Sequence, residues 1–128
     1  MKWSIEFTKD KNYITVTLTG NFNASDHRQM IEDILSQNYW KSGMNLLIDS
    51  RVVDYSKSTL DVMRQAGANM SKFESQIGSG KAAVLMGTLF EFGKGRQFEI
   101  LAEDKSPANI RIFLDESQAV QWLNENSP

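Results

Sequence analysis

The sequence contains no cysteine. Disulfide bonds, thiolate nucleophiles and sulfur-ligated zinc sites are therefore excluded together, since each of them requires a cysteine sulfur. This lack fits a protein of a reducing compartment, and we expect a cytoplasmic location.

Histidine is almost as scarce, because His27 is the only one. It stands beside Arg28, and no serine or carboxylate pattern marks it as part of a catalytic triad. A single histidine without organised partners makes a weak acid–base catalyst, so we interpret His27 as an ordinary surface residue. No nucleophile and base can be paired from their spacing, and we expect no enzymatic activity.

Motifs for metals and nucleotides are also missing. The acidic residues do not follow the alternating spacing of a calcium loop. Gly93-Lys94-Gly95 begins like a dinucleotide fingerprint, but Phe98 stands where the third glycine is required. We therefore expect neither a metal nor a cofactor.

Neither sign of charge dominates the chain. Its 128 residues include 14 basic and 16 acidic ones, and the net charge of −2 gives no field that would attract nucleic acid. No window approaches the roughly 20 apolar residues that cross a bilayer, and residues 1–7 alternate as a strand does, unlike a signal peptide. With 41% apolar residues, we expect one domain over residues 1–128.

The first third of the chain predicts a hairpin and a helix. Apolar side chains alternate over residues 3–7 and 14–18, and a polar turn separates these two strands. A helix follows to about Gln37, and Asn23 or Ser25 can cap its start.

A central strand and a long helix come next. A continuous apolar run over residues 44–48 predicts a parallel strand that has residues 49–50 at its carboxyl end. An amphipathic helix then begins at Ser56 or Ser58, with Leu60 on its apolar side, and ends at a glycine-serine-glycine turn.

The last third repeats the alternation. Strands at residues 82–86 and 110–113 enclose a helix that runs through Leu101, and Asp115 caps a final helix that buries Leu123. The order β-β-α-β-α-β-α-β-α predicts an α/β fold with a mixed, mostly parallel five-stranded sheet and four helices. Ligands and partners of such sheets usually bind at the carboxyl ends of the strands.

Five segments in this order resemble the SpoIIAA-like proteins of the STAS superfamily. They are Leu46-Leu47-Ile48-Asp49, Ala82-Ala83-Val84, Gly93 with Arg96-Gln97-Phe98-Glu99, Ile110-Arg111-Ile112-Phe113, and Ala119-Val120-Gln121-Trp122-Leu123. The resemblance covers nearly the whole chain. It implies a STAS-like domain similar to anti-anti-sigma factors and, more distantly, to CRAL-TRIO lipid-binding domains.

The resemblance also implies a regulatory domain without catalytic activity, switched by phosphorylation of a serine at the start of the second helix. That serine falls near Ser58, with Ser56 and Thr59 as neighbours. The usual switch motif has an acidic residue before two serines and a glycine, whereas this chain has Lys57-Ser58-Thr59-Leu60. Simple N-capping of the helix is the alternative role for these hydroxyl groups.

Two candidate sites follow. A switch or partner surface comprises Ser56, Ser58, Thr59, Asp49, Arg51 and Tyr55. A ligand lip and pocket comprises Leu89, Phe90, Phe92, Arg96, Met63 and Met86. The alternative is that the apolar residues pack in the core, and that Arg96 and Arg51 form salt bridges.

We therefore expect a non-enzymatic regulatory or binding domain. Its first expected partner is an unknown regulatory protein at the carboxyl edge of the sheet, and the alternative is a small apolar or lipid-like ligand. The exposed edge of the hairpin and the second helix also offer a surface for a homodimer.

Overall fold

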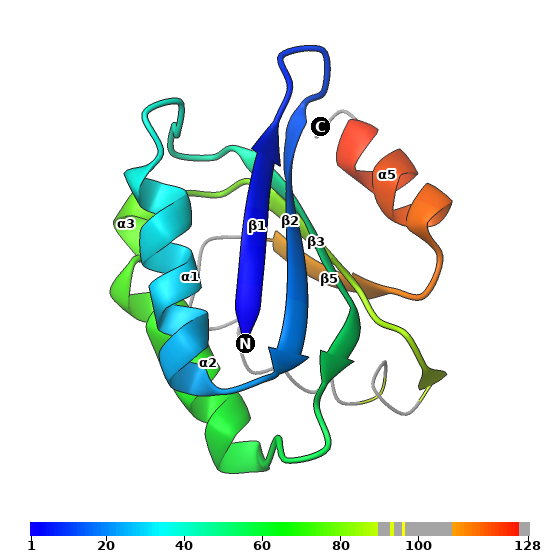
Figure 1. The fold of residues 1–128 in the computed structure, drawn as a ribbon. Coiled ribbons are helices and arrows are strands. Elements are labelled where there is room, and N and C mark those ends of the chain that lie inside the picture. Colours follow the sequence, from blue (N-terminus) through cyan, green and yellow to red (C-terminus); the bar gives the residue numbers. More distant parts are fainter. Residues whose placement is uncertain (90–92, 94–95, 97–108, 126–128) are drawn as a thin grey trace.

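The computed structural model describes residues 1–89, 93, 96 and 109–125, and these residues form a five-stranded α/β fold (Figure 1). The elements follow the chain as β1 (Lys2–Phe7), β2 (Tyr13–Asn21), α1 (Ala24–Ser36), β3 (Asn45–Asp54), α2 (Leu60–Lys72), α3 (Glu74–Ile77), β4 (Lys81–Leu85), β5 (Asn109–Phe113) and α5 (Glu116–Asn124). The predicted helix through Leu101 lies outside the described residues.

The strands stand in the sheet in the order of the sequence, β1-β2-β3-β4-β5. The hairpin β1–β2 is antiparallel, and the pairs β2–β3, β3–β4 and β4–β5 are parallel. The prediction of a mixed, mostly parallel five-stranded sheet is therefore confirmed.

Helices cover both faces of the sheet. In Figure 1, α1, α2 and α3 lie on one side of the strands and α5 lies on the other. The larger apolar cluster joins the first group of helices to the sheet, and it includes Ile14, Val16 and Met30. Trp122 and Leu123 of α5 pack with Leu47, Ala83, Leu85 and other residues in a second cluster on the opposite face.

Side-chain caps define the starts of the long helices. The Asn23 side-chain oxygen Oδ1 accepts from the Asp26 backbone N–H at 2.8 Å, and Asp115 Oδ1 accepts from the Gln118 backbone N–H at 3.1 Å. Thr59, rather than Ser56 or Ser58, caps α2 by accepting from the Val62 N–H at 3.2 Å.

Two expected boundaries are wrong. The central strand does not end at Ile48 but continues to Asp54, because its polar second half pairs with the end of β2, where Val52 lies opposite Thr19. The single long helix is instead divided into α2 and α3 at Phe73. Both predictions were based on local polarity and periodicity. These patterns carry no information about how a strand pairs with its neighbour or how a helix packs.

Candidate functional site

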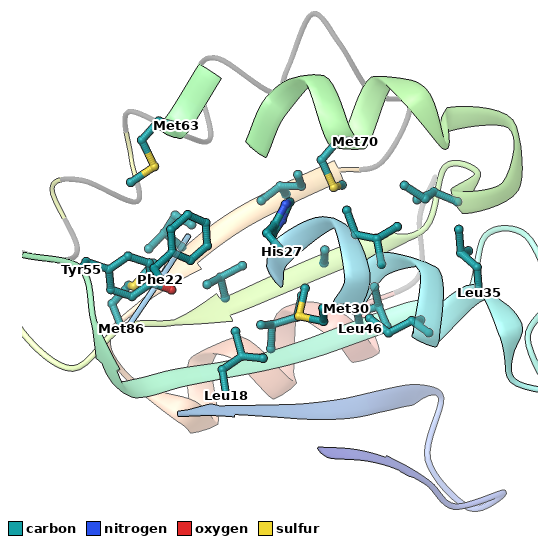
Figure 2. A pocket seen from close by; sticks show the side chains of 18 of the residues that line it. Leu18, Phe22, His27, Met30, Leu35, Leu46, Tyr55, Met63, Met70 and Met86 are labelled. Carbon is teal, nitrogen blue, oxygen red and sulfur yellow. The ribbon is translucent and has the colours of Figure 1, made fainter. Parts of the chain in front are cut away.

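A cavity of about 90 Å³ lies between the sheet and the layer of α1, α2 and α3 (Figure 2). Strands β2 to β5 provide its floor, and side chains of the three helices provide its roof. All its described lining residues except His27 are aliphatic, thioether or aromatic, and four of the chain's six methionines are among them: Met30, Met63, Met70 and Met86.

One end of the cavity lies toward the carboxyl ends of the parallel strands. Phe22, Tyr55, Met63 and Met86 gather there, whereas Leu35 lies at the other end (Figure 2). The rings of Phe22 and Tyr55 are stacked, with centroids 5.1 Å apart. Tyr55 is 4% exposed, so it forms part of this wall rather than presenting its ring on the partner surface.

The end of β4 is held against β3 beside this wall. The buried Ser50 hydroxyl donates to the Leu85 carbonyl oxygen at 2.6 Å and lies 3.4 Å from the Met86 sulfur. Position 87 requires glycine, because a Cβ there would collide with the Arg51 carbonyl oxygen. Met86 is therefore fixed where the chain leaves the sheet.

His27 is buried at 7% exposure, so its interpretation as a surface residue is wrong. It stands three and four residues before Met30 and Ile31, and seven before Ile34, which places it on the buried stripe of α1. This spacing was visible in the sequence and was the signal that could have revealed its burial.

Asn69 of α2 defines the protonation of the His27 ring. Its Nδ2 donates to the Ala24 carbonyl oxygen at 2.9 Å and lies 3.3 Å from His27 Nδ1. Because the Ala24 carbonyl oxygen can only accept, the Asn69 Nδ2 group must face it and donate one hydrogen to it. The second hydrogen of Asn69 Nδ2 then points to His27 Nδ1. His27 Nδ1 is thus the acceptor and the ring proton resides on Nε2. Burial lowers the pKa of His27 to about 4, so the ring is neutral at pH 7.

An ion-paired group occupies the carboxyl edge of the sheet, on the side of α5. The Arg51 guanidinium holds Asp49 in a two-point contact, with Nε–Oδ1 2.9 Å and Nη2–Oδ2 2.8 Å, and Glu116 of α5 lies 3.9 Å from Nη2. The Arg51 hydrogen bonds lower the pKa of Asp49, and the same contact raises that of Arg51. Arg51 therefore has carboxylate partners within the chain.

The hydroxyl groups before α2 differ in accessibility. Ser56 is exposed, and its backbone N–H donates to Asp54 Oδ1 at 2.8 Å. The Ser58 hydroxyl oxygen is buried without a hydrogen-bond partner among the described residues. Thr59 is exposed but caps α2. A kinase would thus meet Ser56 and Thr59 on the surface, and it would reach the Ser58 oxygen only after local opening.

Among the described residues, four large apolar side chains stand exposed near the carboxyl ends of the parallel strands or at the start of α2. They are Val52 (70% exposed), Leu60 (50%), Leu89 (77%) and Leu114 (40%), and we call them the edge apolar residues. Leu60 was expected on the buried side of its helix, but it is the first residue of α2 and faces solvent. Val52 and Leu114 were missed, because single exposed apolar residues carry no sequence signal.

The other residues of the expected ligand lip are only partly described. Arg96 is exposed, and Phe90 and Phe92 lie outside the described residues. Trp40 lines the cavity, and its indole N–H donates to the Gln76 carbonyl oxygen at 3.0 Å. Over the described ranges, no three histidine or acidic side chains gather as metal ligands. None of the helices described there has the length and apolar character needed to cross a bilayer.

Comparison with known proteins supports the architecture. No model of a known protein family matches the sequence, and no curated protein matches it either. The chain is similar to the crystal structure of an uncharacterised protein of the DUF3478 family with a SpoIIAA-like fold from Shewanella loihica PV-4. The two share 19% sequence identity with a TM-score of 0.61, over 95% of this chain and 92% of that one. The chain therefore has a SpoIIAA-like fold, and the fold expected from the sequence resemblance is confirmed.

Proposed function

We propose that the protein is a non-enzymatic binding module that docks a regulatory protein at the carboxyl edge of its sheet. The observation that carries this proposal is the exposure of the edge apolar residues Val52, Leu60, Leu89 and Leu114, each of which lies near the carboxyl end of a parallel strand or at the start of α2. Apolar surface exposed next to charged groups is typical of protein interfaces, because burying it on association is favourable by about 25 cal/mol per Å².

A non-enzymatic role is supported by the state of the only imidazole. His27 is buried and its Nδ1 is engaged by Asn69, so it is poorly placed to take a proton from a nucleophile at the surface. The ion-paired Asp49, Arg51 and Glu116 beside the edge apolar residues suit the polar rim of an interface.

The test of this proposal is partner capture with edge variants. In a cross-linking experiment, we expect the Leu60→Asp and Leu114→Asp variants each to capture at least tenfold less partner protein than the wild type does. Ala68→Asp is the matched control, because Ala68 is exposed on α2 away from its first turn. Equal capture by all three variants would contradict docking at this edge.

The cavity favours a second candidate function, in which the protein carries or senses a small apolar ligand. Its described walls are nearly all apolar, and methionine side chains can adapt to different shapes. Native mass spectrometry of the gently purified protein tests this function. We expect a bound species that dissociates on collisional activation, and a clean apo mass even after incubation with apolar compounds would count against it.

A further inference from the structure

We infer that the cavity takes an uncharged, compact ligand about the size of one aromatic ring, and that it rejects ionised molecules such as carboxylates. This inference rests on the second proposed function, the binding of an apolar ligand. It names the chemistry that the cavity selects, and it follows from the charge of the walls and from the available volume.

The described walls provide no partner for an ionic group. Among the described lining residues there is no aspartate, glutamate, lysine or arginine. The only imidazole is already a hydrogen-bond acceptor at Nδ1 for the Asn69 amide, and its lowered pKa leaves it neutral near pH 7. An ion that moves from water into such surroundings loses its hydration without compensation, which costs several orders of magnitude in affinity.

The charges at the carboxyl edge do not reach the cavity. Leu46 and Ile48 of β3 line it, and successive side chains of a strand alternate between faces, so Asp49 belongs to the opposite face. There Asp49 pairs with Arg51, which also approaches Glu116 of α5. The sheet therefore stands between this ion-paired group and the ligand space.

The volume limits the size of the ligand. A dry apolar cavity of about 150 Å³ is sufficient to bind benzene in an engineered protein. The present cavity of about 90 Å³ is smaller, so it takes one ring only if flexible walls such as Met63 and Met70 adjust. A long acyl chain would require a much larger rearrangement of the helix layer.

Methyl-¹³C methionine NMR tests the inference with controls built into the chain. Met30, Met63, Met70 and Met86 line the cavity, whereas Met1 and Met44 are not among its described lining residues. We expect toluene to shift the four lining methyl resonances and to leave the other two unchanged. Benzoate at the same concentration is expected to bind at least a hundredfold more weakly, and 1-octanol no better than toluene.

A filled cavity provides the matched variant. Ala82 lines the cavity, so Ala82→Leu is expected to weaken toluene binding at least tenfold, while Ala68→Leu adds the same carbon atoms at an exposed position of α2 and leaves binding unchanged. The wild-type titrations remain decisive if Ala82→Leu does not fold.

The outcomes separate this inference from the function on which it rests. Benzoate binding as tight as toluene binding would overturn the exclusion of charge, and octanol binding more than tenfold tighter than toluene would overturn the size limit. Either result would leave an apolar-ligand site in place. No shift with any probe, or equal shifts of all six methionines, would overturn both.

Discussion

At the scale of single residues, His27 shows both what the sequence reveals and what it hides. Its helical spacing to Met30, Ile31 and Ile34 is readable from the sequence, whereas its contact with Asn69 depends on how α1 and α2 pack. The residue type misled us, because histidine is intermediate in its tendency to be buried and does not by itself indicate either environment. Burial removes water from the ring and disfavours its charged form.

The buried imidazole predicts a loss of stability in mild acid. The pKa of His27 is about 4 in the folded chain, against 6.5 ordinarily, so between these values the unfolded chain binds the proton more readily. The contribution of the neutral His27 ring to the free energy of unfolding is complete above pH 6.5 and decreases as the pH falls toward 4. By pH 4.5 the free energy of unfolding should fall by roughly 2–3 kcal/mol. Urea unfolding at pH 7 and pH 4.5 measures this difference.

A variant without the imidazole identifies the source of the effect. We expect His27→Leu to lose less than half as much stability between pH 7 and pH 4.5 as the wild type loses. The carboxyl groups of Asp26, Asp49 and Asp115 have pKa values lowered from 3.8 by hydrogen bonds, so they lose their stabilising contribution only at more acidic pH. An unchanged pH dependence in His27→Leu would contradict the assignment to His27.

At the scale of elements, α5 depends on residues of the sheet and of the hairpin turn for its C-terminal cap. Its last turn contains no basic residue. Instead, Lys81 of β4 reaches over the Trp122 ring and donates from Nζ to the carbonyl oxygens of Trp122 at 2.9 Å and Glu125 at 2.7 Å. Asn12 and Asn45 donate to the Leu123 carbonyl oxygen. These contacts attach the end of the helix to the sheet.

Removal of the Lys81 ammonium group should therefore destabilise the fold. We expect Lys81→Met to reduce the free energy of unfolding by about 1–3 kcal/mol, because charged hydrogen bonds to helix carbonyl groups are lost while the apolar stem remains. Lys57→Met, at an exposed loop position, is the control and should change stability by less than about 0.5 kcal/mol. Chemical denaturation of both variants decides the matter, and equal stabilities would refute the capping role.

At the scale of the whole molecule, the sequence predicted the architecture well and the candidate site poorly. Alternation in the hairpin, the apolar runs of β3 and β4 and the Asp115 cap are local signals, and each of them survives in the structure. The cavity is different, because its volume arises where residues of four strands and three helices fail to fill space completely. Met63 and Met86 could be suspected of lining a pocket, but its size depends on packing that no local pattern records.

The edge apolar residues illustrate the same limit. Leu60 and Val52 are apolar in elements that also bury apolar side chains, so composition alone does not distinguish them from core residues. Their exposure depends on where the elements begin and end: Leu60 is the first residue of α2, and Val52 lies beyond the point at which β4 stops pairing with β3. The expected homodimer through the hairpin or the second helix remains a prediction for a measurement of mass in solution.

The order of the strands in the sheet has a consequence for synthesis. Because each strand lies beside the one that precedes it in the chain, every strand pair in the described sheet forms between consecutive strands. No early strand has to wait for a partner from the far end of the polypeptide, which keeps the loops that must close short. A nascent chain leaving the ribosome can therefore add each new strand to an edge that is already in place.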